Sequence, residues 1–131
     1  MTEVTLPDGW RVAHIALYRE AVSSPEFASN ILVQLRTDAT DPEPERLAHQ
    51  DIEQLRDSGR PLHSLERNEQ NGVFVQECVY DGAGGERLWQ RVSYLRAANG
   101  IYSVAVTDVD GADKVAAKAA VEALVAVLRR A

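Results

Sequence analysis

The side chains that could carry chemistry are few and far apart. The three histidines are His14, His49 and His63, and none lies three or four residues from another or from the single cysteine, Cys78. A local metal site needs ligands at short spacing, so a metal ion here would have to draw its ligands from three separate elements. We therefore expect no metal site, with the histidines on strands or at the surface.

Nucleophilic catalysis has no recognisable arrangement either. Cys78 lies in the stretch VQECVYD, on the strand face that it shares with Phe74 and Tyr80, and this position is typical of a small buried hydrophobic residue. Ser93 and Ser103 lack the Gly-x-Ser-x-Gly turn that exposes a catalytic serine. We expect no catalytic residues, and the protein is not predicted to be an enzyme.

Two further motifs match ligand-binding loops only in part. The stretch GAGG (82–85) precedes a β-rich segment, whereas a phosphate-binding loop places its glycines before a helix, usually with a lysine nearby. Asp108 and Asp110 form an Asp-x-Asp-Gly motif, but Ala117 stands close to where a calcium loop would place its last glutamate. We expect a hairpin loop, a helix cap at Asp110 and a helix-dipole role for Asp113. No cofactor is predicted.

The stretch ERLWQRVSYLR is the clearest candidate for a binding surface. In an extended strand, Arg87, Trp89 and Arg91 share one face. Tryptophan and arginine are enriched among the residues that dominate interface energies, so we predict that these three contact a partner. The alternative is a packing role, in which the arginines bond acidic neighbours across the sheet and a helix covers Trp89.

Apolar alternation and turn residues indicate the elements that position these side chains. Asn-Gly pairs at 71–72 and 99–100 separate β-rich stretches, and this dipeptide favours tight hairpins. A helix is predicted with Asp41 as its N-cap and Pro42 in its first turn. Lys118 and Glu122, four residues apart, are expected to form an ion pair on a second helix. The predicted strands are 11–18, 30–37, 61–70, 73–81, 86–98 and 101–108, and the helices are about 43–57 and 111–130.

The resulting order β-β-α-β-β-β-β-α predicts an α+β fold. We expect an antiparallel sheet of about six strands with helices on both faces. Length and composition predict a single domain over residues 1–131, since 45% hydrophobic and 26% charged residues are usual for a soluble globular protein. The net charge of -6 repels phosphate backbones, so no nucleic-acid partner is expected.

Taken in order, several segments resemble a known family. They are the turn TLPDGW, a strand ending in ILVQLR, a helix containing LAHQDIEQLRD, the meander NEQNGVFVQECVYDGAGGERLWQRVSYLRAANGIYSVAVT and a helix ending in LVAVLRR. This order is similar to the PsbP-like (Mog-type) α/β/α sandwich, in particular its bacterial LpqN/LpqT lipoprotein and DcrB-like branch. The positions that match the family pattern are Pro7, Gly9, Trp10, Gly72, Tyr80, Arg91, Gly100, Tyr102 and Thr107.

The resemblance implies a binding or accessory protein, because no shared catalytic residues of the family transfer to this sequence. The lipoproteins carry a signal peptide and a lipidated cysteine that this sequence does not show, so the expectation includes no membrane anchor. Met-Thr-Glu looks like a natural start and a single cysteine suits a reducing compartment. We therefore expect a cytoplasmic protein, and an exported protein with its signal removed is the alternative.

These features together predict a non-enzymatic binding or accessory module whose partner is a protein or a second copy of the chain. The alternative function is that of a carrier for a small apolar ligand, held in a pocket between sheet and helix. Trp10, Phe27 and Trp89 are the candidate lining residues of such a pocket.

Overall fold

A computed structural model of the chain describes residues 14–18, 30–37, 43–97 and 100–130, and for residues 14–18 it describes the backbone alone. The turn TLPDGW, with Trp10, lies outside these residues. So do Phe27, Asp41, Pro42 and Asn99, and the predictions made for them stay predictions, apart from the cap position discussed below.

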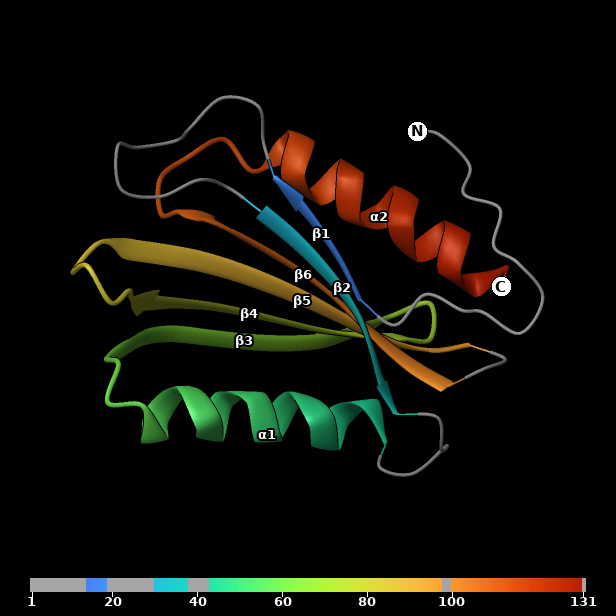
Figure 1. The fold of residues 1–131 in the computed structure, drawn as a ribbon, viewed down its shortest axis with the longest axis horizontal. Coiled ribbons are helices and arrows are strands. Elements are labelled where there is room, and N and C mark those ends of the chain that lie inside the picture. The colour runs from blue at the N-terminus through green and yellow to red at the C-terminus, as the bar shows by residue number, and fades with distance from the viewer. Residues whose placement is uncertain (1–13, 19–29, 38–42, 98–99, 131) are drawn as a thin grey trace.

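The described residues form a mixed α+β fold with an antiparallel sheet and two helices, which confirms the predicted fold class at this level (Figure 1). Every strand pairs antiparallel with its neighbours, in the order β1-β2-β6-β5-β4-β3. The elements are β1 (His14–Tyr18), β2 (Asn30–Thr37), α1 (Pro44–Asp57), β3 (Leu62–Gln70), β4 (Val73–Asp81), β5 (Arg87–Ala97), β6 (Gly100–Val109) and α2 (Val115–Arg129).

Two hairpins join β3 to β4 and β4 to β5, as the turn residues predict. Asn71 and Gly72 have φ angles of 52° and 81°, the positive values that a two-residue hairpin requires and that asparagine and glycine tolerate best. In the GAGG segment the Gly82 N–H donates to the Glu86 carbonyl at 2.8 Å and the Gly85 N–H donates to the Gly82 carbonyl at 3.0 Å. This segment is therefore a hairpin loop.

The helix α1 begins later than the sequence suggests. Its N-cap is Glu43 and Pro44 occupies the first turn, so the expected N-cap at Asp41 is wrong. Pro44 suits the first turn of the helix, because a proline there has no N–H to leave unpaired. Leu47, Ala48 and Ile52 form the buried side of the helix.

The helix α2 also begins later, at Val115, and the predicted cap at Asp110 is wrong. The Ala112 N–H donates to the Val109 carbonyl at 3.1 Å, so a turn follows β6 before the helix can start. Asp113 lies just outside the helix, and its carboxylate accepts the Val115 N–H at 3.0 Å. Asp110 instead lies 3.5 Å from the Lys114 ammonium.

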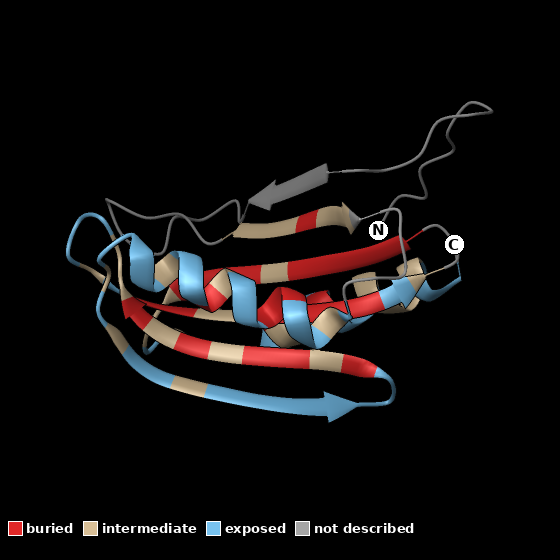
Figure 2. Cartoon of the chain, turned by 90° about the horizontal axis from the view of Figure 1, so that it is seen from below, coloured by how far each residue is buried: buried red, intermediate tan, exposed pale blue. Residues whose placement is uncertain are grey.

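The core is divided by the alternation of side chains along the central strands. On β5, Trp89 and Leu95 pack in one cluster with Val121 of α2, whereas Val92 and Tyr94 pack in another with residues of α1. Figure 2 shows that burial is concentrated in β4, β5 and β6, while the edge strand β3 is largely exposed. The sheet thus has a well-covered centre and an open edge.

Candidate functional site

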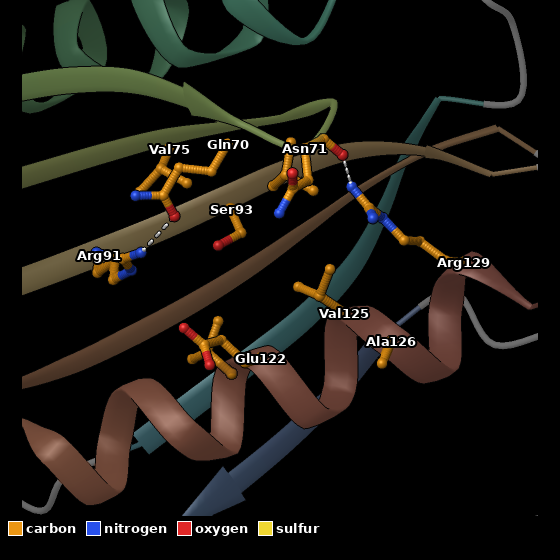
Figure 3. A pocket seen from close by; sticks show the side chains of 11 residues that line it. Gln70, Asn71, Val75, Arg91, Ser93, Glu122, Val125, Ala126 and Arg129 are labelled. Carbon is orange, nitrogen blue, oxygen red and sulfur yellow. Dashed lines mark hydrogen bonds between the residues drawn. The ribbon is translucent and has the colours of Figure 1, made fainter.

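A hollow of about 340 Å³ lies between α2 and the β3–β4 hairpin (Figure 3). It exists because α2 packs mainly against β5 and β6 and leaves the hairpin partly uncovered. We call this hollow the α2 groove. Its lining residues are Gln70, Asn71, Val73, Val75, Arg91, Ser93, Val121, Glu122, Val125, Ala126 and Arg129.

The α2 groove has an apolar floor and a polar rim. Val73 and Val75 of β4 are buried in the same cluster as Val121 of α2, while Val125 is half-buried one helical turn further on. These residues line the same space because side chains two apart on a strand and four apart on a helix share a face. A floor of this kind with a few polar groups around it is the usual composition of a ligand-binding site.

Beside the groove, the Glu77 carboxylate contacts one cation from the sheet and one from α2. The Arg91 guanidinium of β5 donates to its carboxylate at 2.5 Å, and the Lys118 ammonium of α2 lies 3.6 Å from the same oxygen. Burial raises the pKa of Glu77, but the hydrogen bond from Arg91 and the charges of Lys118 and Arg91 outweigh it, so the pKa is lowered. Glu77 therefore carries its negative charge at neutral pH and links α2 to the sheet.

Arg129 closes one end of the groove. It lies in the last turn of α2, and its Nη2 donates to the backbone carbonyl of Asn71 in the β3–β4 turn (Figure 3). This bond spans from the helix to the hairpin. The remaining N–H groups of the guanidinium have no other hydrogen-bond acceptor within the part of the chain that the structure describes.

The three residues predicted to contact a partner are not brought together on one surface. Trp89 is only 3% exposed and packs in the core under α2, with the Lys114 ammonium 5.2 Å from its ring centroid. Arg87 is exposed and lies 3.9 Å from Asp81, whereas Arg91 lines the α2 groove. This is the placement that the packing alternative expects for all three residues, since Arg91 bonds Glu77 across the sheet at 2.5 Å, and of the three residues Arg91 alone lines the groove.

The contacts of the charged cluster beside the groove carry no signal in the local sequence. Lys118 contacts Glu77 on β4 rather than the expected Glu122, four residues along its own helix. The pairing of Glu77 with Arg91 depends on the register of β4 against β5, in which these two residues are direct partners. That register follows from the 82–85 hairpin, so a strand-by-strand alignment of the sequence could have found this pair.

A second polar cluster fixes α1 to the sheet. Arg36 of β2 donates two hydrogen bonds to the Asp51 carboxylate of α1, at 2.9 and 2.7 Å, and the Tyr94 hydroxyl of β5 donates to the same carboxylate. Burial and the Asp51 charge raise the pKa of Tyr94, so it stays a neutral donor. The hydrogen bond to Asp51 raises the pKa of Arg36. The cluster is a clamp between helix and sheet, and neither of the two described hollows lies beside it.

The remaining titratable side chains do not assemble into a reactive site. Burial, together with the Glu77 charge, raises the pKa of the Cys78 thiol to about 11, and the residue packs with Ile52 and Tyr80. His63 pairs with Asp81 at 2.8 Å, at the surface. Among the described residues, no three histidine, cysteine or acidic side chains are close enough to hold a metal ion.

In the part of the chain that the structure covers, neither helix is both long and apolar enough to cross a membrane.

Comparison with known proteins gives a likeness at the level of the fold. No protein-family model matches the chain, and no curated protein sequence matches it. The crystal structure of PA94 from Pseudomonas aeruginosa, described as a candidate regulator of unknown function, superposes with a TM-score of 0.56 at 16% sequence identity. The match covers 92% of this chain and 85% of PA94. At this identity the likeness shows a shared mixed α+β fold and nothing about activity.

Proposed function

We propose that this protein is a non-enzymatic binding module that takes a segment of a protein partner into the α2 groove. The observation that carries the proposal is the hollow itself, which opens between α2 and an exposed β3–β4 hairpin. Its floor is apolar, whereas Arg91, Glu122, Gln70 and Arg129 supply donors and acceptors around it. A polypeptide offers both apolar side chains and polar backbone groups, so it suits such a lining.

The architecture that we propose for the whole chain is the PsbP-like sandwich, one domain with a sheet of six strands and a helix on each face. The pairing of β1 with β2 and the division of the core between the two helices support it. A binding or accessory role is what that family implies, and a location in the cytoplasm, which rests on the single cysteine, is part of the same proposal.

A carrier of a small molecule is the second candidate function. The volume of about 340 Å³ favours it, since pockets for small ligands start at about 300 Å³. The charged rim argues against a purely apolar ligand, because Arg129 and Glu122 would lose water on binding without gaining an oppositely charged partner. Native mass spectrometry of gently purified protein separates the two functions, since a carrier would retain a bound small molecule.

Two matched substitutions on α2 test the protein-binding proposal. Ala126 lines the groove, whereas Ala123 is exposed and does not line it. Ala126→Trp fills the hollow and Ala123→Trp adds the same side chain outside it. Both variants are compared with the unmodified protein against clones selected from a displayed random-peptide library.

We expect selected clones to bind the unmodified protein and Ala123→Trp alike and to lose binding to Ala126→Trp. Clones that bind all three proteins equally would place the interaction elsewhere, and a selection that enriches no clone would contradict the proposed function.

A further inference from the structure

The charges that line the α2 groove are not all neutralised. Arg91 and Lys118 both contact Glu77, so these three form one ion-pair cluster in which two cations share a single carboxylate and a net charge of +1 remains. Arg129 and Glu122 differ from them, since neither has an oppositely charged partner within the described residues. Of the groove's charged lining residues, Arg129 and Glu122 are therefore the two that have no ion-pair partner among the described residues.

These two charges lie at a fixed separation along α2. Arg129 follows Glu122 by seven residues, and an α-helix rises about 1.5 Å per residue, so the two side chains leave the helix about 10 Å apart. An extended polypeptide rises about 3.3 Å per residue. About three residues of an extended ligand would cover the distance between the two charges.

The closed end of the groove indicates where such a ligand stops. The bond from Arg129 to the Asn71 carbonyl spans the space between helix and hairpin (Figure 3). Arg129 also borders a second hollow of about 370 Å³, which is lined by Glu43, Glu45 and Glu69 among others. Arg96 also lines this second hollow and pairs with Glu43 at 2.7 Å, which leaves Glu45 and Glu69 to repel a negatively charged group there, so an anion that reaches Arg129 is favoured on the α2-groove side.

We propose that the α2 groove binds the free C-terminus of a partner polypeptide. The terminal carboxylate lies on the guanidinium of Arg129, where planar N–H groups suit a carboxylate. The last side chains are apolar and pack on Val73 and Val125. A basic side chain three residues before the terminus faces Glu122. Capture of a terminal carboxylate is a recurrent mode of peptide recognition.

An internal aspartate or glutamate offers the same carboxylate chemistry, but the chain would then have to continue past Arg129. The Arg129–Asn71 bridge and the acidic second hollow both oppose that path. The inference rests on the proposed function and adds to it the chemistry and the direction of the ligand.

The test uses short peptides labelled with fluorescein at the N-terminus, with binding measured by fluorescence polarisation. The reference probe is Gly-Gly-Lys-Ala-Val-Leu with a free C-terminus. Its matched controls are the same peptide with a C-terminal amide, and Gly-Gly-Glu-Ala-Val-Leu with a free C-terminus. The protein variants are Arg129→Gln and, as the control, Arg130→Gln, since Arg130 adjoins Arg129 but does not line the groove.

We expect the amide to bind on the order of ten-fold more weakly than the free acid, as loss of a charge-assisted hydrogen bond implies. In Arg129→Gln this difference between acid and amide should disappear, whereas Arg130→Gln should retain it. The glutamate peptide should bind more weakly than the lysine peptide to the unmodified protein but not to Glu122→Gln.

Equal binding of acid and amide would overturn the inference, as would an acid–amide difference that survives in Arg129→Gln. Neither outcome refutes the proposed function, which fails on the separate comparison of Ala126→Trp with Ala123→Trp. Circular dichroism of Arg129→Gln checks that the variant keeps its helices.

Discussion

Removing the Asp51 carboxylate should weaken the attachment of α1 to the sheet. In Asp51→Ala the Tyr94 hydroxyl loses its acceptor, and since Tyr94 is 0% exposed it cannot turn to water instead. An orphaned buried donor costs about 1–3 kcal/mol. The Arg36 side chain is 22% exposed, so its guanidinium regains some water when Asp51 is absent. The loss of the Arg36–Asp51 ion pair therefore adds only about 1 kcal/mol. The expected decrease in the free energy of unfolding is therefore about 2–4 kcal/mol.

Urea unfolding followed by circular dichroism measures this decrease, and Tyr94→Phe supplies the matched comparison. Tyr94→Phe removes the donor together with its need for an acceptor, so it should cost only about 1 kcal/mol, the net value of one hydrogen bond. The double variant should cost less than the sum of the two single ones, because a phenylalanine ring in place of the tyrosine leaves no donor unpaired when Asp51 is absent. A loss below about 0.5 kcal/mol in Asp51→Ala, or strict additivity of the pair, would refute this account of the clamp.

Three further substitutions or reactions follow from the described burial and charge. The lowered pKa of Glu77 means that its contribution to stability is present above its unfolded value of 4.5 and is lost as the pH falls through the lower folded value. Glu77→Gln should therefore reduce the free energy of unfolding at pH 7 by about 1–2 kcal/mol and converge with the unmodified protein in acid; parallel curves for Glu77→Gln would contradict this. Trp89→Ala should lower the free energy of unfolding in urea by about 3–5 kcal/mol, as for a core residue. A decrease below about 1 kcal/mol would contradict the burial of Trp89 under α2. Cys78 should resist iodoacetamide at pH 8 and react after unfolding, since a buried thiol with a pKa of about 11 is almost entirely protonated there; equal labelling rates before and after unfolding would show that the thiol is accessible.

The features that could be predicted from the sequence are those decided by neighbouring residues. The bounds of β2 and β4 match the predicted strands 30–37 and 73–81, because apolar alternation and strong turn residues delimit them. The hairpin at 71–72 follows from the positive φ angles that asparagine and glycine accept. The helix starts were displaced because a turn after β6 and the proline at position 44 override the preferred capping residues.

The groove could not be predicted, because it depends on how elements distant in sequence lie against each other. Alternation along β5 puts Arg87, Trp89 and Arg91 on one face, but only the position of α2 decides that Trp89 is covered and Arg91 lines a hollow. Likewise, Lys118 has a suitable local partner in Glu122, and the tertiary fold gives it Glu77 instead. The sequence shows which residue types are present, but the distances between their side chains depend on the tertiary fold.

The charges beside the groove explain why α2 does not close over the hairpin. Glu77 and Arg91 occupy strand positions that face α2, where neighbouring strand positions carry Val75 and Ser93. A sheet that served packing alone would place apolar side chains there, because apolar residues of similar size often stabilise a protein more than a partly buried ion pair does. With Lys118 drawn to Glu77, the helix is instead held at the distance that the ion pairs set, and the space beyond them stays open. The charged cluster thus accounts for the hollow that Val73 and Val125 line.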